Sequence, residues 1–326
     1  MRSEEAAPWL VPPPFFFRAA RWWSVHGWRG KAALPRLIGR RFYAKMKTAI
    51  RTRSGAVLAV DPQHLDVYCY ISAHGCWDKH VLSQLLNNVR EGDVVYDIGA
   101  NAGSYSVEVA AAFTDRVTVY AFEPQPSLAR AIRTSAELNG FRSIEVHEVA
   151  LCERVGDATM FVPSHSLHAS LVSRQNNATA INCRAETIDN LVSTGRLRPP
   201  TTMKVDVEGA ELAVFQGARD TIARHVPVIL FEADENCRRF GYSPNDLCAL
   251  LQELGDYEFM LIDKASDDPL KAHHLSRSPD MPEGDYLALP KHIIHRLSLL
   301  IFGWYAALDG FARCDAIADC IDACVG

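Results

Sequence analysis

The sequence lacks the features that would place it at once in several common classes of protein. Its nine cysteines include no C-x-x-C pair, which argues against a zinc ribbon or a redox motif. No run reaches the roughly 18 apolar residues that a membrane-spanning helix needs, and the nearest, residues 297–308, is about twelve long. No convincing signal peptide opens the chain. We therefore expect reduced cysteines and a cytoplasmic protein.

Acidic residues are missing from one long stretch near the N-terminus. Residues 18–53 contain many arginines and lysines but no Asp or Glu, although the net charge of the whole chain is −5. With 326 residues, 48% of them hydrophobic and 22% charged, the chain can form one large α/β domain with appendages. We predict a basic, aromatic extension over residues 1–55, partly disordered or helical, a domain over residues 56–290, and a helical tail over residues 291–326.

Tryptophans alternate with cations in this extension, at Trp22, Trp23 and Trp28. Such a mixture can lie on an anionic membrane surface or bind nucleic acid. It is also typical of a helical extension that docks its tryptophans on the core and leaves its cations in solvent. We favour the docked extension, keep peripheral contact of residues 18–53 with an anionic membrane as an alternative, and do not expect nucleic acid.

The most informative segment is residues 94–106, which read VVYDIGANAGSYS. An apolar, β-prone run ends at Asp97, two glycines follow at Gly99 and Gly103, and a helix-compatible run comes next. Glycine lets the backbone pass close to a ligand where a Cβ would collide. The spacing is neither the G-x-G-x-x-G of dinucleotide enzymes nor a phosphate loop that ends in Gly-Lys-Ser/Thr. The segment therefore predicts a strand, a ligand-binding turn and a helix.

A second acid stands where a nucleoside-binding domain needs one. The run over residues 117–122 is β-prone and ends at Glu123, about twenty residues beyond Gly103, the offset at which an acid holds a ribose diol in Rossmann-like units. A carboxylate can accept hydrogen bonds from both hydroxyls of a cis-diol. Taken singly, Asp97 could be a strand-end cap and Glu123 a solvated acid. Their order and spacing together favour a nucleoside site.

The rest of the chain alternates strands and helices, which predicts a doubly wound, Rossmann-like α/β sheet of seven mostly parallel strands. We expect Ser127 to cap the helix that follows Glu123 and Gly140 to end it. A β-hairpin insertion is expected within about residues 152–184. Strands are expected at 94–97, 117–122, 144–149, 202–207, 226–232, 257–262 and, as a final edge strand, 286–289, and helices at 77–88, 107–113, 127–139 and 210–222.

A second group of charged residues lies at the end of the strand over residues 202–207. Lys204, Asp206 and Glu208 alternate, so their side chains should point to the same side. Ligands of open α/β sheets bind at this end of the strands. A lysine among carboxylates can tune a pKa for proton abstraction. With Glu232, the two acids could also hold a divalent cation, although we do not favour a metal, and the group could instead be an ion-pair cluster at a helix start.

These motifs together resemble the FkbM-type methyltransferases, whose fold is similar to that of other class I methyltransferases. The resemblance covers roughly residues 68–262, and its most specific part is the segment Asp206-Val-Glu-Gly-Ala-Glu211. It implies S-adenosylmethionine as the cofactor. It places Asp97, Gly99, Ala100, Asn101 and Gly103 at the methionine end, Glu123 and Pro124 at the ribose, Ala150 along the adenine, and Asp206 and Glu208 toward the methyl group.

The resemblance also implies methyl transfer to a hydroxyl of a sugar, glycan or secondary metabolite. As general base we consider Asp206, Glu208 and His168, and also Lys204 if its pKa is depressed. His168 lies in the polar part of the insertion, which could close over the substrate, although histidines in polar loops are more often merely solvated. The alternative is a macromolecular or membrane-associated acceptor, a lipid-linked glycan or nucleic acid, held by the basic extension.

Overall fold

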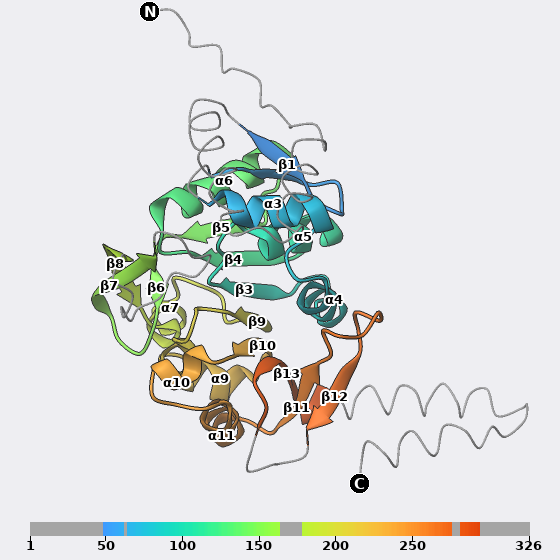
Figure 1. The fold of residues 1–326 in the computed structure, drawn as a ribbon. Coiled ribbons are helices and arrows are strands. Elements are labelled where there is room, and N and C mark those ends of the chain that lie inside the picture. The colour runs from blue at the N-terminus through green and yellow to red at the C-terminus, as the bar shows by residue number, and fades with distance from the viewer. Residues whose placement is uncertain (1–47, 62–63, 164–177, 276–280, 294–326) are drawn as a thin grey trace, which may run out of the picture.

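The computed structural model describes residues 48–61, 64–163, 178–275 and 281–293 (Figure 1). Most of the predicted extension and tail therefore lie outside the described residues. The same is true of His168 and the polar loop of the insertion, so their predicted roles stay predictions.

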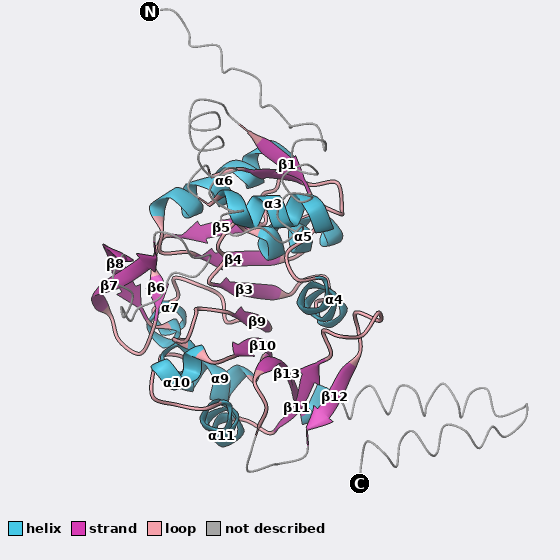
Figure 2. Ribbon diagram, in the orientation of Figure 1, coloured by secondary structure: helices cyan, strands magenta, loops and turns pink. Residues whose placement is uncertain are grey.

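A central sheet of eight strands crosses the molecule in the order β12-β11-β13-β10-β9-β3-β4-β5 (Figure 2). The five strands from β10 to β5 are parallel, whereas β13 runs antiparallel to both of its neighbours. The strands are β3 (Val94–Ile98), β4 (Thr118–Phe122), β5 (Ile144–His147), β9 (Thr202–Val205), β10 (Val228–Ala233), β11 (Tyr257–Ile262), β12 (Ala272–Leu275) and β13 (Gly284–Pro290). The predicted doubly wound, mostly parallel sheet is confirmed, with β12 added at one edge.

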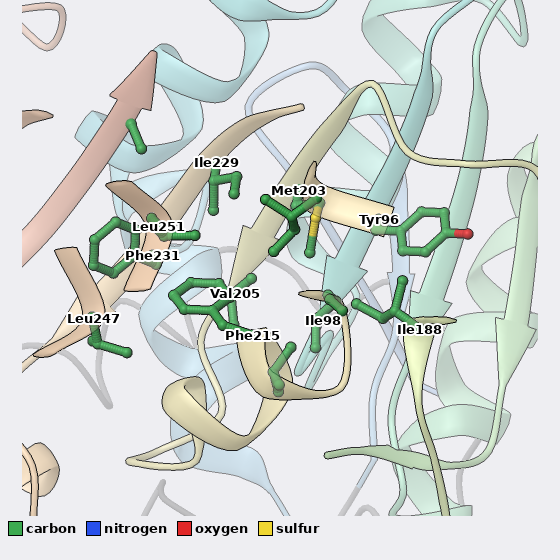
Figure 3. Packing of buried hydrophobic residues seen from close by; sticks show 14 of the residues in the cluster. Tyr96, Ile98, Ile188, Met203, Val205, Phe215, Ile229, Phe231, Leu247 and Leu251 are labelled. Atoms are coloured by element: carbon green, nitrogen blue, oxygen red, sulfur yellow. The ribbon is translucent and has the colours of Figure 1, made fainter. Parts of the chain in front are cut away.

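Both faces of the central strands are buried, which explains why these strands read as nearly continuous apolar runs. Within β3, Tyr96 and Ile98 belong to one core and Val95 to the other. The first core, shown in Figure 3, packs the sheet against Phe215 and Leu251. The helices are α3 (Leu65–His74), α4 (Lys79–Asn88), α5 (Ser104–Phe113), α6 (Pro126–Asn139), α7 (Ile188–Ser193), α8 (Glu211–Gln216), α9 (Arg219–His225), α10 (Asn236–Arg239) and α11 (Pro244–Leu254). Helices α4 and α5 contribute to the second core, and α8 and α11 to the first.

The predicted insertion is a β-hairpin, as expected. Strands β7 (Gly156–Pro163) and β8 (Ala178–Glu186) pair antiparallel, and β6 (Ala150–Leu151) joins β8 in a small separate sheet. A second hairpin, β1 (Ala49–Arg51) and β2 (Val57–Ala59), packs against α6 and straddles the boundary predicted at residue 55. None of the helices in the described part of the chain combines the length and apolar character that crossing a bilayer requires.

Three details differ from the sequence predictions. Helix α6 begins at Pro126 with Gln125 as its N-cap, so Ser127 lies inside the first turn, although Gly140 ends the helix in a left-handed conformation as predicted. Strand β13 lies between β10 and β11 and not at the edge. The single helix expected over residues 210–222 is divided into α8 and α9 at Gly217.

The residue at the break must be a glycine for a steric reason. A Cβ built on this residue would lie 2.0 Å from the carbonyl oxygen of Cys152, so the backbone of the insertion passes directly over it. We expect Gly217→Ala to lower the free energy of unfolding by roughly 1–3 kcal/mol, the usual cost of forced overpacking. Urea denaturation measures this change. The neighbouring exposed substitution Gln216→Ala should stay within about 0.5 kcal/mol of wild type, and an equal effect of both variants would contradict the steric explanation.

Candidate active site

A cavity opens at the carboxyl ends of β3, β4 and β9, the edge at which α/β sheets bind ligands. It encloses about 970 Å³ of empty space, its open mouth included. Its wall contains seven of the predicted cofactor residues: Gly99, Ala100, Asn101, Glu123, Pro124, Ala150 and Asp206. Lys204 and Glu208 also line it, so the structure brings both groups of residues singled out in the sequence to one site.

Glu123 lies on the cavity wall in a well-defined orientation. Its Oε2 accepts a hydrogen bond from the backbone N–H of Asn101 at 2.9 Å, and its Oε1 accepts one from the N–H of Gln125 at 2.9 Å. Burial raises the pKa of Glu123 to about 7, although both hydrogen bonds oppose the shift. Asn101 is held at φ +50, and its buried Oδ1 has no hydrogen-bond partner among the described residues. A ligand with hydroxyl or amine donors would satisfy these acceptors.

Asp97 is not part of the cavity wall. Its Oδ2 accepts hydrogen bonds from the backbone N–H and the hydroxyl of Ser106, at 3.1 and 2.6 Å. Ser106 is in the first turn of α5, where backbone N–H groups lack partners within the helix. The Asp97 carboxylate therefore places a negative charge at the start of α5. Gly103 is also absent from the wall; a Cβ there would lie 2.9 Å from the Ile132 side chain, so this glycine permits close helix packing.

The turn after β3 and the loop after β9 touch through their backbones. A Cβ on Gly99, whose φ is +75, would lie only 1.9 Å from the carbonyl oxygen of Asp206. The N–H of Asp206 donates to the carbonyl oxygen of Ile98 at 3.1 Å. A displacement of the loop that carries Asp206 would therefore also displace the turn after β3, which lines the cavity.

Lys204 contacts both of these segments. Its Nζ lies 3.6 Å from Asp97 Oδ1 and 3.4 Å from Asp206 Oδ2, and it donates to the carbonyl oxygen of Gly99 at 3.1 Å. The Tyr105 ring lies 4.9 Å from this ammonium, a distance typical of a cation–π contact. Burial alone would lower the pKa of Lys204, but the two carboxylates outweigh burial and raise it. The depressed pKa that a lysine base would need is therefore not present.

Further acids surround this lysine at the next strand ends. Glu232, at the end of β10, has its pKa raised to about 10 by burial and then by the charges of Asp206 and Asp285. Both effects favour the neutral form of this carboxyl group. Glu208 is held at φ +57 and contacts Asn236 Nδ2 through Oε2 at 3.4 Å. No set of three or more metal-binding side chains in the described residues is arranged to hold a metal ion.

Sequence reasoning missed several residues of the wall. Val67 and Ile71 come from α3, a helix that the hydrophobic pattern did not predict, and Met160 reaches the cavity from β7. Trp77 and Tyr105 also line it. Tyr105 directly follows the glycine turn, so its place in the sequence was a usable signal, whereas the contribution of α3 depends on tertiary packing.

The sheet order, with the reversed β13 beside β10, and a ligand cavity at the carboxyl ends of β3 and β4 define the class I methyltransferase fold. Residues 97–257 match the methyltransferase FkbM domain. The chain belongs to this family of methyltransferases.

The chain is also similar to individual proteins. The hexuronic acid methyltransferase AglP of Haloferax volcanii is 27% identical over 176 residues, which cover 54% of this chain and 68% of AglP. The crystal structure of an FkbM methyltransferase from Methylobacillus flagellatus aligns with a TM-score of 0.43 and 19% identity over 71% of this chain. The alignment spans 56% of that chain. Fibrillarin from Aeropyrum pernix, solved with bound S-adenosylmethionine, aligns with a TM-score of 0.37 and 12% identity over 74% of this chain and 81% of its own.

Removal of the buried cation tests how far the site depends on it. We expect Lys204→Met to lower the free energy of unfolding by roughly 3–5 kcal/mol, because the buried carboxylate of Asp97 would lose its counterion. Chemical denaturation followed by circular dichroism gives the value. The exposed Lys79→Met is the matched control and should change stability by less than about 0.5 kcal/mol. A Lys204→Met protein as stable as the control would mean that the two carboxylates need no cation.

Proposed function

We propose that this protein transfers a methyl group from S-adenosylmethionine to a hydroxyl of a sugar, glycan or secondary metabolite. The observation that carries the cofactor assignment is the Asp97 carboxylate at the start of α5. Helix N-termini bind phosphate in nucleotide-binding folds, and a pyrophosphate would meet a negative charge at this one. A nucleoside with a cationic, phosphate-free tail fits the position better.

The cavity offers a partner for each part of such a cofactor. Glu123 would accept the ribose hydroxyls, and the apolar side chains of Val149, Leu151 and Met160 would contact the adenine. Gly99 and Ala100 leave room for the methionine end, because their segment adds no bulky side chain to the wall. The carboxylates of Asp206 and Glu208, on the same wall, favour a positively charged sulfonium.

S-adenosylmethionine would supply the methyl group in an already activated form, so the protein must position the acceptor and remove its proton. Positioning alone can contribute roughly 7–11 kcal/mol. Asp206 and Glu208 are the described candidates for the base, which adds about 10²–10⁴-fold. We assign Lys204 to positioning, because its raised pKa keeps it charged. His168 stays a predicted alternative outside the described residues.

Aromatic side chains beside the cavity support a sugar acceptor. Tyr70 is 43% exposed, and its ring centroid lies 4.9 Å from that of Trp77, which lines the cavity. The C–H face of a pyranose packs well on such rings, and the nearby ion pair of Asp78 with Lys264, at 2.6 Å, provides partners for hydroxyls. AglP, a relative that acts on a hexuronic acid, is consistent with a sugar. Contact of residues 18–53 with a membrane stays a prediction, since most of them lie outside the described residues.

The cofactor assignment is tested by calorimetric titration with S-adenosylmethionine and, separately, with NAD. We expect binding of the first only, and at least a tenfold loss in Glu123→Gln. Each oxygen of Glu123 accepts a hydrogen bond from a backbone N–H. The side-chain NH₂ of a glutamine would point at one of these two donors and could not accept its hydrogen bond. The exposed Glu137→Gln should bind like wild type. Binding of NAD in preference to S-adenosylmethionine would contradict the assignment.

The aromatic face is tested with a panel of methyl pyranosides and glucuronic acid as acceptors. For an acceptor that is methylated, Tyr70→Ala should raise KM by roughly 2–10-fold, the worth of one aromatic contact, and leave kcat and cofactor affinity nearly unchanged. Val155→Ala, a substitution at a distant exposed residue, is the control. If Tyr70→Ala and Val155→Ala behave alike, the acceptor does not use this face.

A further inference from the structure

A buried hydrogen-bonded group lies directly behind the loop that carries Asp206 and Glu208. Glu211 is 2% exposed and Tyr242 is 8% exposed. Glu211 Oε1 accepts hydrogen bonds from the backbone N–H groups of Val207 at 3.0 Å and Gly209 at 3.2 Å. Its other oxygen, Oε2, lies 2.7 Å from the Tyr242 hydroxyl, which also lies 2.9 Å from the carbonyl oxygen of Gly209.

The number of hydrogen atoms decides which form of Glu211 fits this geometry. The Tyr242 hydroxyl has one hydrogen, yet it faces two acceptors, Glu211 Oε2 and Gly209 O. If Glu211 were ionised, Tyr242 could donate to only one of them. The other pair of oxygens would then lie in contact with no hydrogen between them. If Oε2 carries a proton, it donates to the tyrosine oxygen, and Tyr242 donates to Gly209 O. Every contact is then satisfied.

We propose that Glu211 is a positioning residue that works as a neutral carboxylic acid: it donates to Tyr242, accepts from Val207 and Gly209, and so holds the Asp206–Ala210 loop in its binding conformation. The proposal concerns a proton on a residue that does not line the cavity. Its effect on turnover rests on the proposed methyl transfer, whereas its effects on stability and cofactor binding do not.

The loop needs such support because its backbone is unfavourable. Glu208 adopts φ +57, which is uncommon for a residue with a side chain. Gly209 adopts φ +100, and a Cβ there would lie 2.6 Å from the Phe240 ring. The two N–H groups bound by Glu211 flank Glu208 on either side. Loss of these bonds would allow Glu208 to leave its backbone conformation. Because Asp206 contacts Gly99, the change would also disturb the turn after β3 that lines the cavity.

The surroundings of Glu211 agree with a neutral acid. No described lysine, arginine or histidine pairs with it, and burial raises its pKa to about 7, although its hydrogen bonds oppose the shift. The titratable groups that face it are Tyr242 and Cys237, and burial raises the pKa of each, that of Cys237 to about 12. Both are therefore uncharged at neutral pH. Farther out, Glu208 and Asp234 both accept from Asn236 Nδ2, and Arg239 donates to Oδ1 of the same asparagine at 2.7 Å, so this outer group contains charges of both signs.

The direction of the pH effect follows from these values. Below the ordinary glutamate pKa of 4.5, Glu211 is protonated in both the folded and the unfolded protein, so its ionisation does not change the free energy of unfolding. Between about 4.5 and 7 the unfolded chain ionises first, and the folded protein loses stability relative to a variant that stays neutral. Above about pH 7 the difference in stability between wild type and such a variant is constant, and Glu211 is ionised in the folded protein as well.

Glutamine is an isostere of the protonated acid, so Glu211→Gln is the informative variant. Its oxygen can accept both N–H groups, and its NH₂ can donate to Tyr242, which is then free to donate to Gly209. We compare wild type, Glu211→Gln, Glu211→Ala and Tyr242→Phe between pH 5 and 9. The measurements are the thermal midpoint and the dissociation constant of S-adenosylmethionine. Glu253→Gln, in an exposed ion pair with Arg219, is the matched control.

We expect the midpoint of Glu211→Gln to exceed that of wild type slightly at pH 5 and by much more at pH 8. The affinity of wild type relative to Glu211→Gln should fall about tenfold from pH 6 to 8, whereas Glu211→Ala and Tyr242→Phe should bind weakly throughout. Two carboxyl resonances, those of Glu123 and Glu211, should titrate near pH 7 in ¹³C-glutamate-labelled protein. One of them should disappear in Glu211→Gln and the other in Glu123→Gln, and both should persist in Glu253→Gln.

A Glu211→Gln protein that is less stable than wild type and binds weakly at pH 6 would overturn the proposal, because an ionised carboxylate would then be required. A Glu211 resonance that titrates near pH 4 would overturn it too. Failure of the methyltransferase assignment is a separate result: wild type would then not bind S-adenosylmethionine at any pH, while the midpoints and the carboxyl titration would still report the protonation of Glu211.

Discussion

The architecture of the site depends on one buried ammonium group. Lys204 extends from β9 beneath the turn that follows β3, where it meets a carbonyl oxygen and two carboxylates that would otherwise repel one another. The same lysine connects the segment expected to hold the cofactor with the segment expected to hold the base. The backbone contact between Gly99 and Asp206 makes that connection rigid. Cofactor affinity and acceptor chemistry should therefore be difficult to alter separately.

Two buried glutamates illustrate how geometry selects a proton state. Burial raises the pKa of both Glu123 and Glu211 to about 7, yet their partners differ. Each oxygen of Glu123 faces a backbone N–H, so the ionised form satisfies its donors. At Glu211 one oxygen takes both N–H groups and the other faces a hydroxyl. Burial alone cannot separate these cases, whereas a count of donors and acceptors can.

Much of the fold was predictable because hydrophobic periodicity is a local property. The strands, the hairpin insertion and the convergence of Glu123, Asn101, Lys204 and Asp206 all follow from pattern and from the rule for strand ends. The errors arise where a distant segment decides the outcome. Nothing in the sequence near Gly217 indicates the close approach of the Cys152 carbonyl, which only a glycine at this position permits. Likewise, the partner of Glu211 is Tyr242, 31 residues along the chain.

The carboxylate of Asp97 has a further consequence for redesign of the cofactor site. Replacing the glycine spacing with that of a dinucleotide enzyme would not be enough to make the protein accept one, because the charge at the start of α5 would remain. Removing that charge would in turn leave Asp206 as the ion-pair partner of Lys204 among the described residues. Exchange of one cofactor class for another would thus require several simultaneous substitutions.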